Sequence, residues 1–212
     1  MRGERYPLIQ DSVWYIPDGC EDKPFIFPGW NQLFALNQPV CIEYCSGNGD
    51  WIAAKAKTHP DQNWVAVERK FTRVQKIWSK LKNHHLTNLF VICGEGHNAT
   101  HHHFPDGSID AVYINFPDPW PKRRHAKYRL VQPNFIHEIK RILKERGTLT
   151  LVTDDEAYSQ SMIKDVHLVG GFQSIFPSPY FALEHPGYGT SYFENLWRQQ
   201  EKVIRYHQFY KN

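Results

Sequence analysis

The sequence predicts an α/β domain built on a doubly wound, mostly parallel sheet. From about residue 40 onward, short apolar runs alternate with longer amphipathic runs. The short runs are apolar enough to be covered on both faces, which is typical of parallel strands. The length of 212 residues fits one such domain with a sizeable core. Strands that alternate with helices in this way indicate a sheet flanked by crossover helices.

Each element follows from its own local pattern. The predicted strands are residues 40–44, 64–68, 89–93, 109–116, 148–153 and, at the end of the chain, 203–209. The predicted helices are residues 50–58, 71–85 and 132–143. In the second helix, Val74, Ile77 and Leu81 recur at helical spacing. The third has Pro133 in its first turn and is predicted to stop before Gly147, as helix start and stop signals indicate.

Composition narrows the class of protein. The chain has 25 basic and 22 acidic residues, so its net charge is only +3. No run approaches the ~18 apolar residues of a membrane span. The N-terminal residues lack the pattern of a secretory signal or a transit peptide, which predicts a cytoplasmic protein. Residues 1–39, rich in Pro, Gly and aromatics, are predicted to form an N-terminal arm on a domain that spans residues 40–212.

The cysteines and histidines do not indicate a metal site. Cys20, Cys41, Cys45 and Cys93 form no C-x-x-C pair, so reduced thiols are expected and neither a disulfide framework nor a zinc site is predicted. Residues 101–103 are three consecutive histidines, whose side chains do not easily converge on one ion. We expect them to lie in a polar loop before Phe104.

A carboxylate follows each of five consecutive predicted strands. They are Glu43, Glu68, Glu95, Asp118 and the pair Asp154-Asp155. Ligands bind outside the carboxyl ends of the strands in doubly wound sheets, so these acids are candidate site residues. Asp and Glu also cap the helices that follow strands, which is the alternative explanation for any one of them.

The turn after the first of these strands contains Gly47 and Gly49. A dinucleotide fingerprint needs a third small residue where the chain has Ile52, which disfavours a dehydrogenase, and no Gly-Lys-Ser/Thr sequence indicates a Walker-type loop. A glycine turn flanked by acids suits a ligand with hydroxyl and ammonium groups and no phosphate. S-adenosylmethionine fits this description, with Glu68 placed to bind the ribose hydroxyls.

The segment from Asn115 to Trp120, Asn-Phe-Pro-Asp-Pro-Trp, is the most specific local signal. Two prolines fix the backbone around Asp118, and Phe116 and Trp120 offer flat surfaces for a nucleobase. A basic run follows, with nine Lys or Arg residues against two Glu over residues 122–146. A charge run is often only a solvated face, but beside this pocket it predicts nucleic-acid binding.

These motifs resemble those of the bacterial tRNA (guanine-N7)-methyltransferases, and the resemblance runs from about Cys41 to Phe209. The stretch from Phe116 to Lys122 with the basic run after it is similar to the signature of that family. Thr153-Asp154 and the segment from Ser191 to Glu194 match a Thr-Asp pair and a Thr-x-Phe-Glu motif. The resemblance implies a Rossmann-like class I methyltransferase fold with a seven-stranded sheet and helices on both faces.

The resemblance also implies S-adenosylmethionine as methyl donor and a guanine in the tRNA variable loop as acceptor. It assigns cofactor contacts and substrate contacts to matching positions, with Asp118 as the catalytic residue. The cofactor residues are Glu43, Gly47, Gly49, Glu68, Glu95 and Asp118; the substrate residues are Lys122, Asp154, Ser191, Tyr192, Phe193 and Glu194; the RNA-binding residues are Arg124, His125, Lys127 and Arg129. A monomer or homodimer without an obligate protein partner is expected.

The sequence departs from the family pattern at four positions. Cys45 and Ser46 replace the usual start of the glycine turn, Ser191 replaces Thr, and Glu95 stands where Asp or Asn is common. No functional group that the chemistry needs is lost. Two alternatives stay open: an exocyclic-amine RNA methyltransferase, since residues 115–118 loosely resemble the motif of that class, and a non-catalytic RNA-binding module on the same fold.

Overall fold

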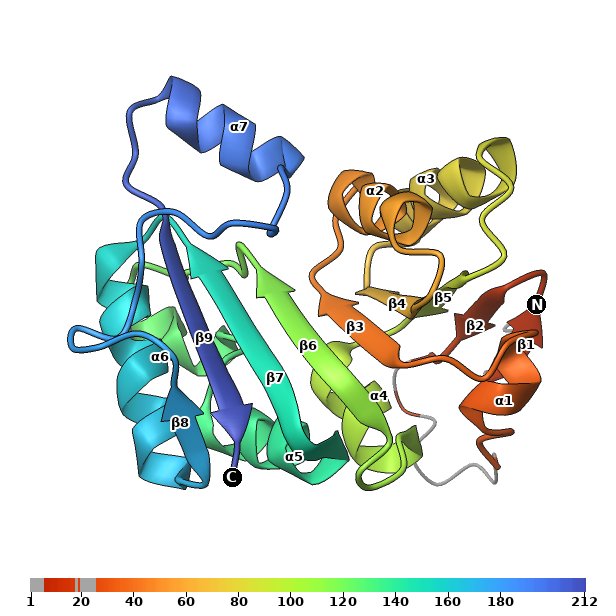
Figure 1. Cartoon of the computed structure of the whole chain (residues 1–212), viewed down its shortest axis with the longest axis horizontal. Coiled ribbons are helices and arrows are strands. Elements are labelled where there is room, and N and C mark those ends of the chain that lie inside the picture. Colours follow the sequence, from red (N-terminus) through yellow and green to blue (C-terminus); the bar gives the residue numbers. More distant parts are fainter. Residues whose placement is uncertain (1–5, 18, 20–25) are drawn as a thin grey trace. The chain divides into compact units, whose positions relative to one another are not determined.

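The computed structural model describes residues 6–17, 19 and 26–212. Cys20 and part of the predicted N-terminal arm lie outside the described residues. The chain divides into two compact units, Met1–Pro105 and Asp106–Asn212, and each is described by itself (Figure 1). No helix in the described part of the chain is long and apolar enough to cross a lipid bilayer.

The first unit is a five-stranded sheet with four helices among its described residues. Its elements are β1 (Leu8–Gln10), β2 (Val13–Tyr15), α1 (Trp30–Leu33), β3 (Val40–Tyr44), α2 (Asp50–Thr58), β4 (Asn63–Glu68), α3 (Phe71–Asn83), β5 (Leu89–Cys93) and α4 (Gly96–His103). The strand order is β1-β2-β5-β4-β3. All neighbours are parallel except β1, which pairs antiparallel with β2.

Every side chain of β3, β4 and β5 is buried, because helices cover both faces of this sheet. On one face, Trp51 of α2 packs edge-on against Trp64 of β4, with ring centroids 5.8 Å apart. The hydroxyl of Tyr44 lies 2.5 Å from that of Thr100 in α4. Tyr44 pairs with Val67, which points to the opposite face from Trp64 because successive strand side chains alternate. The predicted double coverage is confirmed.

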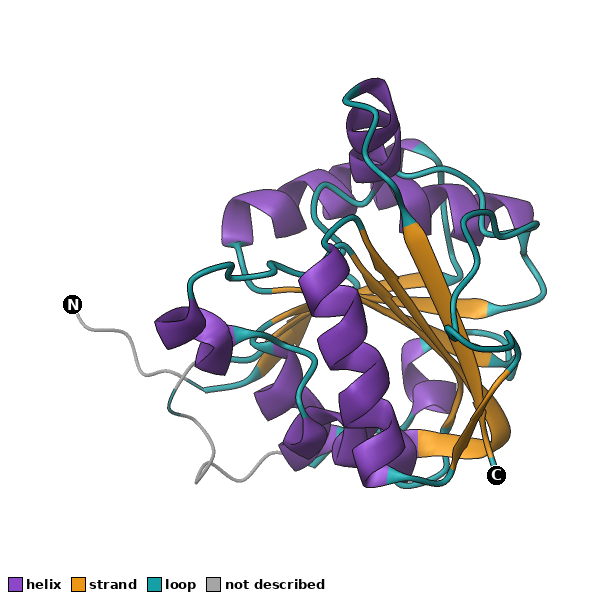
Figure 2. Cartoon of the chain, turned by 90° about the vertical axis from the view of Figure 1, so that its left-hand side faces the viewer, coloured by secondary structure: helices purple, strands orange, loops and turns teal. Residues whose placement is uncertain are grey.

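The second unit has a mixed sheet of four strands in the order β6-β7-β9-β8. Its elements are β6 (Ile109–Asn115), the 3-10 helix η1 (Arg123–Tyr128), α5 (Pro133–Ile142), β7 (Leu143–Thr153), α6 (Glu156–Val169), β8 (Phe172–Ser174), α7 (Tyr192–Gln199) and β9 (Arg205–Lys211). β6 and β7 are parallel, whereas β9 is antiparallel to both β7 and β8. Helices flank the strands of each unit (Figure 2).

The fold class and the main elements agree with the sequence prediction, but the described residues form nine strands, where the family resemblance implied seven and the local patterns placed six. The additional strands β1, β2 and β8 have three residues each, too few to show an apolar period. β1 and β2 belong to the predicted arm, and β2 extends the sheet beside β5.

Two local predictions were wrong. Gly147 does not end the third helix, because α5 stops at Ile142 and Gly147 lies within β7, where the pairing with β6 jumps from Leu143 to Thr148. A Cβ on Gly147 would lie 2.8 Å from the carbonyl oxygen of Lys144, so glycine allows this irregularity. The histidines at 101–103 end helix α4 rather than forming a loop, because the Glu95 side chain caps the start of that helix.

Candidate functional site

The glycine turn between β3 and α2 is tightly wound. Gly47 and Gly49 have φ values of 56° and 77°, and Cys45 also has a positive φ of 61°. The Ser46 hydroxyl donates to the carbonyl oxygen of Glu43 at 2.9 Å, so the two departures from the family pattern fit within a closed turn. A Cβ on Gly49 would lie 2.7 Å from Cγ1 of Ile77 in α3. Gly49 therefore serves both the backbone conformation and the close approach of α3.

Glu68, the last residue of β4, joins the glycine turn to the start of α3. The Gly47 N–H donates to its Oε2 at 2.9 Å, and the Lys70 N–H donates to its Oε1 at 2.8 Å. The Arg73 guanidinium lies 3.7 Å from Oε2. The side chain of Glu68 is 6% exposed. A carboxylate oxygen can accept more than one hydrogen bond, so these contacts leave Glu68 able to accept a further hydrogen bond from a ligand.

Three carboxylates of the first unit gather around one thiol. Burial, together with the charges of Glu68, Glu43 and, more weakly, Glu95, raises the pKa of Cys45 to about 12. Burial and the charge of Glu68 likewise raise the pKa of Cys93 to about 11. Glu43, Glu68 and Glu95, from β3 and from the ends of β4 and β5, thus act electrostatically on the same thiol. Such a group of carboxylates favours a cationic ligand.

Glu95 also has a structural role, because it is the N-cap of α4. Its carboxylate accepts hydrogen bonds from the N–H groups of His97 at 3.1 Å and Asn98 at 2.6 Å. In the second unit, Asp155 caps α6 in the same way by accepting the N–H of Tyr158 at 2.7 Å. Helix capping thus accounts for part of the carboxylate pattern, but not for the buried Glu43, which stands within β3.

The Asp118 segment of the second unit is a strained, well-held loop. Phe116 and Trp120 both have left-handed backbone conformations, with φ values of 47° and 43°. The Trp120 N–H donates to Oδ1 of Asp118 at 3.1 Å, and Arg129 Nε donates to the carbonyl of Pro119 at 2.7 Å. Asp118 itself is exposed. Strain of this kind, at about 1–3 kcal/mol for each residue, persists where the surroundings hold it and is frequent at functional sites.

The predicted RNA-binding residues have different environments within the second unit. Arg124 and Lys127 are exposed on η1, and Lys122 is exposed just before it. His125 packs edge-on against Trp120, with ring centroids 5.7 Å apart. Arg129 instead turns toward the protein, since it holds Pro119 and lies over the Tyr158 ring at 4.8 Å. Its most direct role is to support the Asp118 loop.

The segment from Ser191 to Glu194 starts helix α7. Ser191 is its N-cap, with its hydroxyl accepting the Glu194 N–H at 3.0 Å. Glu194 is buried, and its Oε1 accepts hydrogen bonds from the Tyr206 hydroxyl at 2.7 Å and from Arg198 Nε at 3.0 Å. Tyr192 is 54% exposed. The Phe193 ring lies 6.3 Å from the Phe116 ring, so α7 contacts the loop that carries Asp118.

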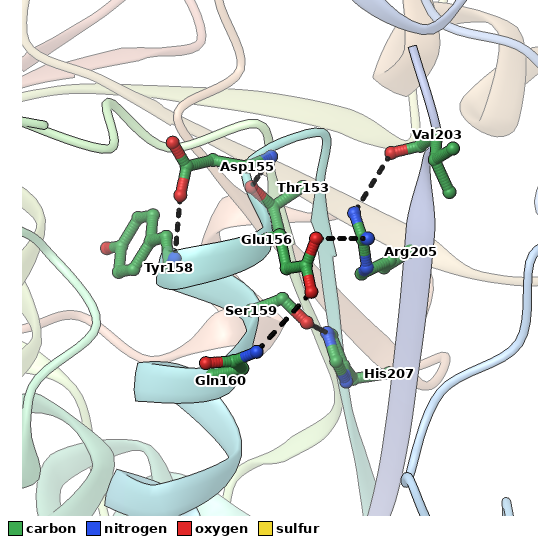
Figure 3. A network of polar contacts seen from close by, with 9 residues as sticks. All are labelled: Thr153, Asp155, Glu156, Tyr158, Ser159, Gln160, Val203, Arg205 and His207. Atoms are coloured by element: carbon green, nitrogen blue, oxygen red, sulfur yellow. Dashed lines mark hydrogen bonds and ion pairs between the residues drawn. The ribbon is translucent and has the colours of Figure 1, made fainter.

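Asp154 lies at the end of β7 and forms an ion pair with Lys202, Nζ to Oδ2, at 2.6 Å. The surrounding polar network includes the ion pair of Glu156 with Arg205 at 3.2 Å and the contact of Ser159 with His207 at 3.1 Å (Figure 3). This network joins the start of α6 to β9.

Sequence reasoning missed Lys202, Arg198 and Tyr206. The Ser-x-x-Glu spacing at 191–194 is a capping-box signal that predicts a helix start, and Arg198 follows Glu194 at the spacing of a helical ion pair. These two signals indicate α7 and one of its contacts. The pairing with Tyr206 and Lys202 depends on the tertiary fold.

Comparison with known proteins shows which family and which fold the chain is similar to. The family model described as "Putative methyltransferase" matches residues 37–205. Among solved structures, the 16S rRNA methyltransferase KamB is similar with a TM-score of 0.64 at 12% identity, over 90% of this chain and 95% of that one. The aminoglycoside resistance methyltransferase NpmB1 gives a TM-score of 0.57 at 15% identity, over 82% and 87% of the two chains. These structures share the fold.

Closer relatives are curated proteins named tRNA (guanine-N(7)-)-methyltransferase. The protein of Chlamydia muridarum is 44% identical over 211 residues, which cover 98% of this chain and 92% of the relative. That of Chlamydia trachomatis is 42% identical with the same coverage. The Thermotoga maritima protein is 33% identical over 68% of this chain and 47% of its own length. Being 42–44% identical to the two Chlamydia relatives over 98% of its length, the chain belongs to the tRNA (guanine-N7)-methyltransferase family.

Proposed function

We propose that this chain transfers the methyl group of S-adenosylmethionine to N7 of a guanine in the variable loop of tRNA. The observation that carries this function is its 42–44% identity, over 98% of the chain, to proteins named for that reaction. We also propose that it acts in the cytoplasm as a monomer or homodimer without an obligate protein partner.

The first unit supplies groups that fit the donor. Glu43, Glu68 and Glu95 are anionic acceptors, suited to the ammonium and hydroxyl groups and to the sulfonium charge of S-adenosylmethionine. Gly47 lets a ligand approach the backbone of the turn, since it carries no side chain, and Gly49 lets that turn pack closely against α3. When bound, S-adenosylmethionine supplies an electrophilic methyl group. The pKa of Cys45 is raised first by burial, and the charges of Glu68 and Glu43 add to that rise, which supports an acidic surrounding for the donor.

Asp118 is our proposed catalytic residue and a further cofactor contact. Guanine N7 already carries an unprotonated lone pair, so the reaction needs no general base to create the nucleophile. Positioning is the main requirement, and a well-oriented pair of reacting groups gains several kcal/mol over a free encounter. Asp118 is suited to accept hydrogen bonds from the N–H edge of the guanine, and its charge counters the cation that forms on the methylated ring.

The substrate contacts are assigned to Lys122, Asp154 and the start of α7. Because Ser191 caps α7 and Glu194 is held by Tyr206 and Arg198, these two residues act by fixing the helix. Tyr192 and Phe193 are then the side chains of this segment that face the base. Arg124, His125 and Lys127 are assigned to the RNA, with Arg124 and Lys127 on its phosphates, whereas Arg129 acts through the Asp118 loop that it holds.

The test is methyl transfer from radiolabelled S-adenosylmethionine to unmodified bulk tRNA, followed by strand cleavage specific for N7-methylated guanine. We expect label in tRNA and cleavage at one position in the variable loop. Label at an exocyclic amine would instead identify the alternative acceptor. Binding of tRNA without any transfer, together with no calorimetric signal for S-adenosylmethionine, would leave only the non-catalytic binding module.

A further inference from the structure

We propose that Lys202 is a positioning residue that orients the Asp154 carboxylate and ties it to helix α7. This inference rests on the proposed function, in which Asp154 contacts the acceptor base. Lys202 lies between the end of α7 at Gln199 and the start of β9 at Arg205. Its Nζ lies 2.6 Å from Oδ2 of Asp154, a distance typical of a strong charge-assisted hydrogen bond.

The backbone beside Asp154 is already fixed without Lys202. The hydroxyl oxygen of Thr153 accepts the N–H of Asp155 at 3.1 Å, and the Asp155 carboxylate caps α6 through the N–H of Tyr158 at 2.7 Å (Figure 3). These bonds hold the turn that carries Asp154 but leave its side-chain torsions undefined. The contact with Lys202 defines them.

Lys202 is itself held by α7. Its Nζ lies 3.6 Å from the centroid of the Trp197 ring, a cation–π contact, and its backbone N–H donates to the Trp197 carbonyl at 3.0 Å. Glu201, just before it, has a left-handed φ of 58° that turns the chain out of the helix. The ammonium group is therefore directed from both its side chain and its backbone.

Helix α7 is in turn anchored at other points. Glu194 is buried against Tyr206 of β9, and Phe193 lies beside Phe116 at 6.3 Å, in the loop that leads to Asp118. Trp197 stacks with Phe193 at 6.3 Å. Through these contacts, one helix touches both the Asp118 loop and, by way of Lys202, Asp154. The contact of Lys202 thus sets Asp154 relative to the proposed catalytic loop within the second unit.

Stability does not explain this pair. The Lys202 side chain is 40% exposed and that of Asp154 is 15% exposed, and ion pairs with such exposure contribute little to folding. Orientation is a stronger effect, since a displacement of about 1 Å at a positioning group costs up to ~100-fold in rate. Asp154 has two oxygens with several acceptor sites, so it binds Lys202 at Oδ2 and still accepts from a base.

The test uses full-length Lys202→Met, Lys202→Arg, Asp154→Asn and the Lys202→Met/Asp154→Asn double variant. Lys211→Met is the matched control, since Lys211 pairs with Glu145 at 3.2 Å in the same unit but lies outside the basic run. We expect Lys202→Met to lower kcat/KM for tRNA by about tenfold or more while the KM for S-adenosylmethionine stays unchanged. Lys202→Arg should recover most of the loss, and Lys211→Met should match the wild type.

The double variant gives the decisive comparison, because two residues that act as one unit are not additive. We expect it to be no slower than Asp154→Asn alone. Multiplicative losses, or a Lys202→Met enzyme as fast as the wild type, would overturn the inference. If the melting temperature shows that Lys202→Met does not fold, Trp197→Leu takes its place. This variant removes the ring contact that directs the Lys202 ammonium group but keeps the charge of Lys202. An unchanged kcat/KM for tRNA in Trp197→Leu would also reject the positioning role. An inactive wild-type chain would instead reject the proposed function.

Discussion

Two carboxylates of the first unit combine a structural role with an electrostatic effect. Glu68 accepts the N–H of Gly47 in the glycine turn and that of Lys70 before α3, and Glu95 caps α4, yet both charges act on the Cys45 thiol. The helix-capping explanation and the ligand-binding explanation are therefore compatible for these residues. A carboxylate fixed by its own backbone is preorganised, so it loses little freedom when it binds a ligand.

Asp118→Asn is the first test at the residue scale. The substitution removes the negative charge but keeps the size of the side chain. We expect kcat to fall by on the order of 10²-fold, which corresponds to about 2.7 kcal/mol of transition-state stabilisation. Single-turnover methyl transfer to tRNA measures the effect. Asp106→Asn, at an exposed position in the same unit, is the control, and near-wild-type turnover by the Asp118 variant would refute its role.

The Cys45 thiol tests the convergence of carboxylates without any activity assay. Since its pKa is raised to about 12, almost all of the thiol is protonated at pH 8.5, and alkylation should be slow. Glu68→Gln and Glu43→Gln each remove a charge that raises this pKa, so both should speed alkylation of Cys45 at constant pH. Peptide mapping by mass spectrometry identifies the modified cysteine. Glu145→Gln, in the second unit, is the control and should leave the alkylation rate unchanged. If Glu68→Gln and Glu43→Gln also leave this rate unchanged, the clustering of carboxylates around Cys45 is contradicted.

At the scale of elements, the β3–α2 turn combines two constraints on one residue. Gly49 needs a left-handed backbone and also leaves no room for a Cβ beside Ile77. Gly107 has a similar φ of +54° but no atom within 4 Å of an added Cβ. The two glycines therefore separate backbone strain from packing.

Gly49→Ala should lower the free energy of unfolding by about 2–4 kcal/mol, from left-handed strain of about 1–2 kcal/mol and overpacking against Ile77. Gly107→Ala should show only the strain. Urea unfolding followed by circular dichroism measures both. Equal losses of unfolding free energy in the two variants would mean that the close approach of α3 does not contribute to the effect of Gly49→Ala.

On the scale of the whole molecule, charge is unevenly distributed along the chain. Residues 122–146 carry a net +7, so the rest of the chain sums to −4 of the total +3. An uneven charge of this kind steers an anionic partner to one segment and keeps the acidic remainder from binding phosphate. The net charge of +3 on the whole chain is too small to indicate an anionic partner by itself.

Neutralising Arg124 and Lys127 together should weaken tRNA binding and reduce its salt dependence. RNA binding releases counterions, so each lost phosphate contact should lower the slope of log K against log salt by roughly 0.7. Filter binding at several salt concentrations measures the slope. The Lys57→Gln/Lys76→Gln variant, at exposed positions in α2 and α3, provides a control of equal charge change outside the basic run. The same slope in the wild type and in the Arg124/Lys127 variant would show that η1 does not contact RNA.

The buried His207 predicts a pH dependence of stability. Burial lowers the pKa of His207 from 6.5 to about 4, and the nearby charge of Arg205 lowers it further. The hydrogen bond between Nδ1 and the Tyr180 carbonyl acts in the opposite direction and raises this pKa. Between these values the unfolded chain binds more protons, so this contribution is complete above pH 6.5 and decreases as the pH falls toward 4. The full loss is on the order of 3 kcal/mol.

Urea unfolding at pH 7 and at pH 4.5 measures this loss. His207→Asn should be less stable at pH 7, but its stability should fall less between the two pH values than that of the wild type. His84→Asn, at an exposed position after α3, should keep the wild-type difference. An unchanged pH dependence in His207→Asn would exclude His207 as its source.

The sequence by itself determined the strands β3 to β7, the glycine turn, the order of the strand-end carboxylates and the basic segment. These features depend on neighbours along the chain: apolar period, turn residues and local charge. Short strands such as β8 were missed, because three residues show no period.

Only the tertiary structure decided which side chains these motifs contact. Asp154 meets Lys202, 48 positions along the chain, because β9 pairs antiparallel with β7. Glu194 meets Tyr206 because the start of α7 lies against β9. Arg129 turns from the expected RNA surface to the Pro119 carbonyl for a similar reason. Long-range contacts depend on strand pairing and helix packing, and no local pattern encodes those partners.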